Sequence, residues 1–275
     1  MKLTYLGTAA SEGFPAVFCN CKYCQEARKL KGKNIRTRSQ TLINDDLLID
    51  FPQDSYVHFL QNGIEADKIK YLLVTHSHMD HLYAPDLAAR GSAYAHDMRA
   101  ETLEIYCGEG AYKALDAEFN GDTRFTSHVQ KIEPFKPTKM GDYEITALPA
   151  RHMFGDGALI YIVRHNGKTL FYGNDTGYCY DEVFEYIEKN GITFDMCSYD
   201  CTNVHIPIGD DGVHMGFPNI ARLIEKFKQI GAVTEKTIQY VTHFSHNGNP
   251  IQSLLEESAS PLGCKVAYDG LQVEF

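Results

Sequence analysis

One short stretch decides the fold of this chain, Thr75-His76-Ser77-His78-Met79-Asp80-His81. It follows an apolar run at residues 71–75, typical of a strand buried on both faces, and precedes a helix predicted at residues 81–89. Side chains two apart in extended backbone project to the same side, so His76 and His78 can bind one metal ion. Asp80 and His81, at the expected helix start, can reach a second ion. A polar loop of solvated histidines is disfavoured, because clustered imidazoles repel one another when protonated.

Three further candidate ligands each come directly after a later predicted strand. They are His152, Asp175 and His243, which follow the strands predicted at residues 143–148, 169–172 and 237–241. Each alone is typical of a cap or turn residue. Together, at equivalent positions in the topology, they indicate a site for two metal ions, in which the Asp175 carboxylate could bridge both.

Strand and helix patterns alternate along most of the chain. Strands are predicted at residues 2–6, 41–43, 47–50, 71–75, 104–107, 143–148, 158–163, 169–172, 194–199, 237–241 and 272–275. Helices are predicted at residues 81–89, 111–118, 181–189, 218–228 and 251–258. The early strands follow one another directly, whereas helices separate later ones. This order predicts an α/β protein with two mixed sheets and helices outside, in preference to a doubly wound parallel sheet.

Composition limits the number of domains and the classes of partner that the chain can have. The 275 residues are 44% hydrophobic and 23% charged, which suits one domain spanning 1–275. The formal charge of -10 disfavours an extended nucleic-acid surface and favours a small partner. No apolar run reaches the ~18 residues of a membrane span. The first residues lead into a strand pattern and not a signal peptide, so we expect a cytoplasmic protein.

Three cysteines form a second cluster with metal-ligand spacing. Cys19, Cys21 and Cys24 supply thiolates one and two residues apart, whereas a closed structural zinc site needs four ligands. A fourth ligand must therefore come from elsewhere. The alternative is three reduced thiols in a flexible loop. The other cysteines lack such spacing and are predicted to be small buried residues: Cys107, Cys179, Cys197, Cys201 and Cys264.

The ligand pattern resembles the metallo-β-lactamase-fold hydrolases over essentially the whole chain. That resemblance implies a four-layer αββα sandwich with the metals at one edge between two sheets. It implies one ion held by His76, His78 and His152, a second held by Asp80, His81 and His243, and Asp175 as the bridge. Asp50 also matches a family position and is expected to support the ligand loop; a turn carboxylate is the alternative.

The cysteine cluster indicates which subfamily the chain resembles. The family likeness places residues 242–246 near the N-terminal loop, which makes His246 the candidate fourth zinc ligand. A Cys3His zinc beside a binuclear centre resembles the phosphoribosyl cyclic phosphate phosphodiesterases of phosphonate breakdown. The expected cofactors are two divalent ions (zinc, manganese or iron) in the active site and one structural zinc.

The resemblance also implies catalytic roles. Two metals would supply a bridging hydroxide as nucleophile. His214 matches a family position opposite the metals and is the predicted general acid, which Asp200 at a strand end could orient. The predicted catalytic residues are His214, Asp80 and Asp200. The segment with Arg36, Arg38 and Ser39 could bind a second phosphate group, but a solvated cationic loop is the favoured interpretation.

Several functions share these metals. We expect a phosphodiesterase acting on a small anionic phosphoester, cyclic or linear. A tRNA-processing endonuclease of the same fold is the nearest rival, but no basic, glycine-rich arm is evident and the charge is acidic. A thioester or lactam hydrolase would use the same metals on a carbonyl carbon. The non-enzymatic alternative is a metal-binding sensor module. A homodimer is expected only from the frequency of two-fold assemblies, and no membrane partner is expected.

Overall fold

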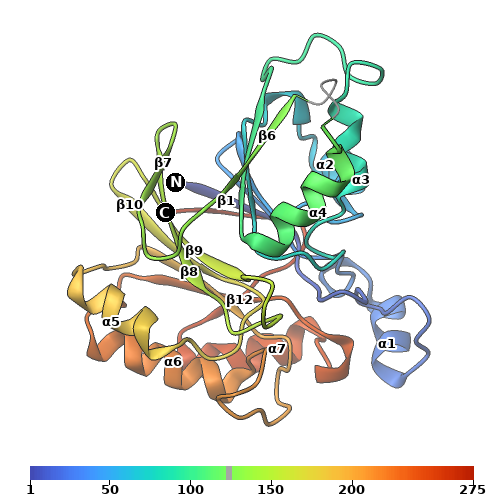
Figure 1. The fold of residues 1–275 in the computed structure, drawn as a ribbon. Helices are drawn as coiled ribbons and strands as arrows, with labels where there is room; N and C mark the ends of the chain where they lie inside the picture. Colours follow the sequence, from blue (N-terminus) through green and yellow to red (C-terminus); the bar gives the residue numbers. More distant parts are fainter. Residues whose placement is uncertain (122–125) are drawn as a thin grey trace.

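The structure, a computed structural model, describes residues 1–121 and 126–275 and contains two packed seven-stranded sheets (Figure 1). The strands of the first sheet are, in spatial order, β14 (Leu271–Glu274), β1 (Lys2–Gly7), β2 (Gln40–Ile43), β3 (Leu47–Ile49), β4 (Tyr71–Val74), β5 (Leu103–Cys107) and β6 (Ser127–Lys131). Those of the second are β13 (Lys265–Val266), β12 (Ile238–Thr242), β11 (Met196–Asp200), β10 (Lys168–Gly173), β9 (Leu159–His165), β8 (Tyr143–Pro149) and β7 (Thr138–Met140).

Both sheets are mixed. In the first, β14, β1, β2 and β3 pair antiparallel, and β3 to β6 pair parallel. In the second, β7 to β10 pair antiparallel, and β10 to β13 pair parallel. The predicted pair of mixed sheets is therefore confirmed.

Helices cover the outer face of each sheet (Figure 1). On the first sheet these are α2 (Ser55–Asn62), α3 (Ala84–Leu87) and α4 (Glu109–Phe119). On the second they are α5 (Asp181–Lys189), α6 (Phe217–Gln229) and α7 (Gln252–Ala259). Helix α1 (Lys22–Leu30) lies apart, at the edge of the molecule. Short 3-10 turns complete the chain: η1 (Gly32–Asn34), η2 (Ala66–Lys68), η3 (Ala88–Arg90), η4 (His246–Gly248) and η5 (Ser260–Leu262).

The four layers follow from strands that are apolar on both faces. In β9, Leu159, Tyr161 and Val163 pack between the two sheets. The alternate residues Ile160 and Ile162 pack outward, against the helices of the second sheet. Because side chains alternate along a strand, one continuous apolar run fills two cores. The αββα sandwich is thus confirmed.

One predicted boundary is wrong. Residues 81–89 do not form one helix, since α3 begins only at Ala84 and passes into η3. Pro85 lies in its first turn, where the ring fits best. Asp80 and His81 therefore lie in a turn before the helix. Hydrogen bonds from the His81 and Leu82 amides to the His78 carbonyl close this turn. Among the described residues, no helix combines the length and apolar character that crossing a bilayer requires.

Candidate metal centre

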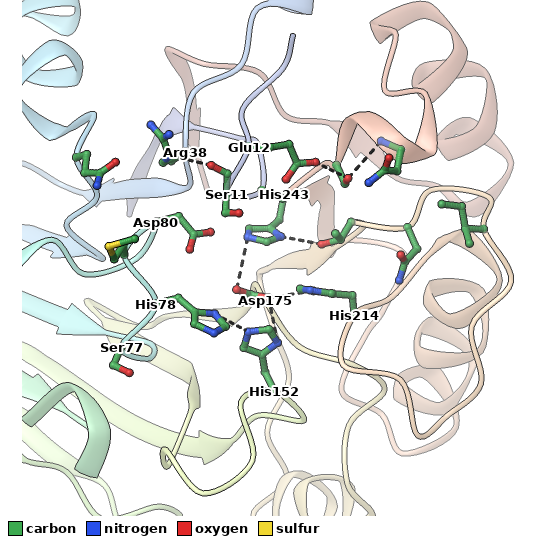
Figure 2. A pocket seen from close by; sticks show the side chains of 18 residues that line it. Ser11, Glu12, Arg38, Ser77, His78, Asp80, His152, Asp175, His214 and His243 are labelled. Carbon is green, nitrogen blue, oxygen red and sulfur yellow. Dashed lines mark hydrogen bonds and ion pairs between the residues drawn. The ribbon is translucent and has the colours of Figure 1, made fainter. Parts of the chain in front are cut away.

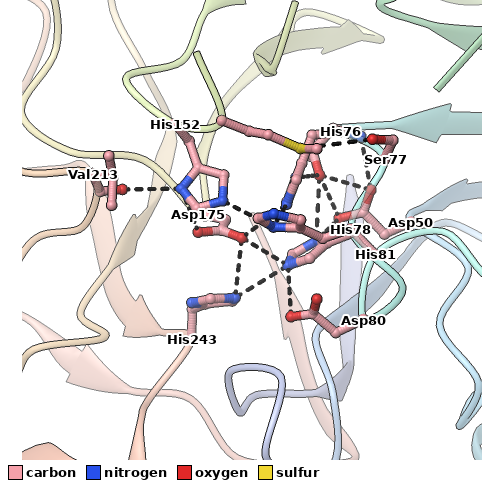
Figure 3. Close-up of polar contacts among 12 residues, drawn as sticks. Asp50, His76, Ser77, His78, Asp80, His81, His152, Asp175, Val213 and His243 are labelled. Atoms are coloured by element: carbon pink, nitrogen blue, oxygen red, sulfur yellow. Dashed lines mark hydrogen bonds and ion pairs between the residues drawn. The ribbon is translucent and has the colours of Figure 1, made fainter. Parts of the chain in front are cut away.

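All seven predicted active-site ligands meet at one edge of the sandwich (Figures 2 and 3). Four lie in the turn after β4, and the others follow β8, β10 and β12. Strands from both sheets deliver their ends to this edge, as expected of a site built on strand termini.

The first group comprises His76, His78, His152 and Asp175. One ligand atom from each lies within 4.8 Å of the others. His78 Nδ1 is 2.9 Å from His76 Nε2 and 3.2 Å from His152 Nε2. Asp175 Oδ2 lies 3.2 Å from His76 Nε2. Three imidazoles and a carboxylate with these separations could hold one divalent ion.

The second group comprises Asp80, His81, His243 and again Asp175, with ligand atoms within 4.8 Å of one another. His81 Nε2 lies 3.0 Å from Asp175 Oδ2 and 3.5 Å from Asp80 Oδ2. Asp175 therefore stands between the two groups, where a carboxylate can bridge two cations. It is nearly completely buried.

Two hydrogen-bond chains fix which ring nitrogens face the site. His81 Nδ1 donates to Asp50 Oδ2 over 2.7 Å, and Asp50 also accepts from the Thr75 amide. His243 Nδ1 donates to Thr202 Oγ1 over 2.7 Å, since Thr202 donates in turn to Asp200. The Nε2 atoms of His81 and His243 thus both face the site and lie 3.2 Å apart. Two ring nitrogens so close repel unless a proton or a cation lies near both, so these residues fit a metal.

The backbone is strained at these positions. Asp50, Asp175 and His243 have φ angles of 66°, 54° and 63°. Left-handed backbone is uncommon for residues with a Cβ atom and clusters at functional sites. The buried hydrogen bonds of Asp50 and the chain through Thr202 hold this geometry in place.

The protonation of His76, His152 and Asp175 suits metal binding. Burial opposes the charged form of His81, but Asp50 and Asp175 outweigh it and raise the pKa of His81 well above its usual value. Burial, together with the neighbouring imidazoles, lowers the pKa of His76 well below its usual value. Burial likewise lowers the pKa of His152. Burial acts to raise the pKa of Asp175, but His243 and the other histidines outweigh it and hold that pKa well below the usual range. Neutral imidazoles and an ionised carboxylate are the forms that bind divalent ions.

His214 lies beside the cluster, with Nδ1 3.0 Å from Asp175 Oδ1 (Figure 2). Burial opposes its charged form, but ion pairs with Asp175 and Asp200 raise the pKa of His214 to about 10. Asp200 is fully buried, and its contact with His214 is 3.4 Å. Its shorter bonds go to Thr202 and to the Met215 amide. Asp200 therefore contacts His214 and also holds Thr202 and the backbone beside His214, and its role in orienting the His214 ring stays a prediction.

The site opens into a cavity of about 880 Å³. Sequence reasoning missed much of its polar wall, which includes Glu12, Gln53, Asn203 and Asn247. These residues carry no motif or periodicity that could have marked them. Arg38 also lines the cavity, held by Asp54 at 3.1 Å.

The interpretation of residues 36–39 as a solvated loop is wrong. Arg36 is only 2% exposed, and Ser39 is fully buried. Arg36 Nη1 donates to Thr8 Oγ1 and to the Ala267 carbonyl, and its guanidinium lies over the Phe244 ring. These partners come from distant parts of the chain. Arg36 therefore lies outside the cavity and contacts the three segments that contain Thr8, Phe244 and Ala267.

The cysteine cluster forms a third group outside the catalytic cavity. Cys19, Cys21, Cys24 and His246 place one ligand atom each within 4.8 Å of the others. The hydrogen bond from the Cys24 amide, helped by His246, lowers the pKa of Cys21 to about 6. A thiolate is the form that binds zinc. The remaining cysteines are free and buried as predicted: Cys107, Cys179, Cys197, Cys201 and Cys264.

Comparison with known families agrees with this geometry. The profile of the β-lactamase superfamily domain matches residues 48–244, which carry the ligand turn after β4 and every later ligand of the two groups. The chain therefore belongs to the β-lactamase superfamily. Fold and family together identify a metallo-β-lactamase-fold hydrolase.

Solved structures of this superfamily resemble the chain along its whole length. A diphosphatase of the PhnP family is 22% identical, with a TM-score of 0.74, and the match covers 100% of this chain and 97% of that one. Zinc-bound PqqB from Methylobacterium extorquens is 19% identical, with a TM-score of 0.77, and the match covers 100% of both chains.

A curated relative matches over a shorter segment. An octanoyltransferase of Porphyromonas gingivalis is 35% identical over 86 residues. The match spans 30% of this chain and only 16% of that protein's length.

Proposed function

We propose that this superfamily member is a binuclear metal-dependent phosphodiesterase that cleaves a small phosphodiester, cyclic or linear. The observation that carries the proposal is the pair of ligand groups sharing Asp175, with the half-buried His214 beside it at the floor of a polar cavity. His76, His78 and His152 would hold one ion, and Asp80, His81 and His243 the other. When bound, two divalent ions activate a water and polarise the phosphoryl oxygens.

The chain's own residues supply the remaining steps. His214 is placed to donate a proton to the leaving oxygen, since its side chain is 24% exposed while Asp175 and Asp200 favour its protonated form. Arg38 offers a guanidinium to an anionic substrate within the same cavity. The overall charge of -10 favours a small anion held in this confined site over a long polyanion.

The proposal includes the cofactors and their setting. The imidazole and carboxylate groups suit zinc, manganese or iron, whereas the thiolate group with His246 selects zinc. Thiolate ligands persist in reducing compartments, so we assign the protein to the cytoplasm.

A hydrolysis assay on the purified protein tests the proposal. We expect release of p-nitrophenol from bis(p-nitrophenyl) phosphate with manganese or zinc, together with about three metals per chain, one of them resistant to chelation. Asp175→Asn should retain the chelation-resistant metal and lose most hydrolysis. Two metals bound in the cavity with no hydrolysis would reject phosphodiesterase activity and leave the sensor module as the better interpretation.

Acyl-thioester hydrolysis is a second candidate, favoured by the match to an octanoyltransferase. The same residues would then act on a carbonyl carbon. A parallel assay with S-octanoyl-N-acetylcysteamine, followed by thiol release, separates the two. A higher kcat/KM on the thioester than on the phosphodiester would favour this candidate.

A further inference from the structure

A second cavity of about 820 Å³ lies beneath α2, beside α3 and the segment at residues 88–98. Strands β3, β4 and β5 supply its floor through Leu48, Leu72 and Leu103, which are almost completely buried. Packed interiors leave few voids larger than a water molecule. A space of this size, bounded mainly by apolar side chains, is in the range of small-molecule sites.

One charged group in the cavity wall lacks a counter-ion. Arg90 Nη2 donates to the Ala100 carbonyl over 2.8 Å, but the buried Nε has no hydrogen-bond partner among residues 1–121 and 126–275. Within the described part of the chain, no carboxylate lies within 4.0 Å of Arg90. The wall contains two carboxylates: Asp67 is paired with Arg99, and Asp86 forms no ion pair with any residue that the structure describes. Arg90 is half-buried, so its guanidinium is accessible to an anion that enters the cavity, and such an anion would give the buried Nε a partner.

The cavity adjoins the metal centre. Gln53 lines both cavities. Phe51 places its side chain in the wall of the apolar cavity, while its backbone amide donates to the carbonyl of His81 over 2.7 Å. Asp50, which holds the His81 ring, is the preceding residue. The two cavities therefore share one wall and remain separate binding spaces.

We infer that this cavity binds an amphipathic anion, a medium-chain fatty carboxylate, with its chain along the floor of leucines and its carboxylate on Arg90. Aliphatic side chains bury the chain without requiring specific polar contacts. The guanidinium can donate two hydrogen bonds to the carboxylate oxygens, one of them from the unpartnered Nε. The inference goes beyond the proposed hydrolysis, because it holds whichever bond the metal centre cleaves.

Calorimetric titration of the metal-loaded protein tests the site, with saturating inorganic phosphate present to occupy the metal centre. We expect decanoate to bind with an affinity that phosphate does not change. Arg90→Gln should weaken decanoate about 10- to 100-fold, the scale of a charge-assisted hydrogen bond. Decanol, which has the chain without the charge, should bind the variant and the parent equally.

A pair of tryptophan substitutions locates the site. Ala95 lines the cavity, so Ala95→Trp should abolish binding of both decanoate and decanol. Ala93→Trp, on an exposed neighbour outside the wall, should change neither. Hydrolysis of bis(p-nitrophenyl) phosphate by both variants should match the parent, so failure of this inference and failure of the proposed function are distinguishable.

Three results would overturn the inference. Competition between phosphate and decanoate would show that the decanoate carboxylate binds at the metal centre and not on Arg90. If Arg90→Gln weakened the binding of decanol and decanoate equally, Arg90 would not recognise the charge of the carboxylate. Absence of decanoate binding, with a dimer that Ala95→Trp dissociates, would instead make this face a contact between two copies of the chain.

Discussion

His214 differs from the seven ligands in the direction of its ring nitrogens. Its side chain is 24% exposed, and its Nδ1 faces Asp175, which leaves Nε2 as the atom available to a substrate. The other imidazoles point their free nitrogens at the space between the two groups. This difference supports proton transfer for His214 and metal binding for its neighbours.

We predict that His214→Ala lowers kcat at least ~100-fold, because the leaving oxygen loses its proton donor. Metal content should stay unchanged, as measured by elemental analysis. His205→Ala, at an exposed histidine bonded to Ser258, is the matched control and should keep full activity. Normal turnover in His214→Ala would assign the proton transfer to another group.

Among single residues, the sequence predicts short motifs better than it predicts buried charges. The sequence placed His76 and His78 correctly together, because their spacing in an extended segment brings them near each other. It misjudged Arg36, because no local pattern tells that a cation after three lysines will be buried on Phe244. The metal-binding role of the assembled ligands stays a prediction.

Among the elements, strands with continuous apolar runs were predicted well and short polar ones were not. β6 exposes most of its residues at a sheet edge, and β7 and β13 contain three and two residues. α1 and α2 were also missed. α1 contains the last cysteine of the motif, Cys24, and buries only two residues, so it gives little apolar signal.

We expect the N-terminal loop to be the element most dependent on the proposed zinc. Glu12 accepts hydrogen bonds from Ser245 and from the His246 amide, so the loop contacts the segment that carries His243. Cys24, in the first turn of α1, packs with the small apolar cluster around Phe14. This cluster is separate from the two sheet cores.

We predict that Cys24→Ser removes about one zinc per chain and makes residues 11–31 sensitive to limited proteolysis. Structural zinc contributes directly to folding free energy, so a small satellite cluster should loosen without it. Cys264→Ser, at a buried thiol outside the cluster, should retain the zinc. A zinc content unchanged in Cys24→Ser would argue against the proposed site.

At the scale of the whole molecule, one buried histidine links stability to pH. His58 in α2 is fully buried, with Nδ1 2.7 Å from Gln40 Oε1 and Nε2 2.7 Å from Thr37 Oγ1. Burial lowers the pKa of His58 to about 4, against a smaller opposing effect of Asp54. The unfolded chain, with a pKa near 6.5, therefore binds a proton before the folded one does.

This contribution of His58 to the free energy of unfolding is fully present above about pH 6.5 and is lost as pH falls toward 4, by up to about 3 kcal/mol. We predict a flatter pH dependence for His58→Gln over this range, measured by urea unfolding of the metal-free proteins. Parallel curves for the two proteins would show that His58 does not titrate in this way. The predictions of one domain over residues 1–275 and of a homodimer stay predictions.

The sequence alone determined the alternating strands and helices, the ligand turn after β4 and the cysteine triplet. These features depend on spacing within a few residues. Only the tertiary structure decided that Asp175 stands between two ligand groups, that His246 meets the cysteines, that Arg36 is buried and that Arg90 faces an apolar cavity. Each of these depends on which strand ends and loops meet across two sheets, and such long-range contacts leave no periodic pattern in the chain.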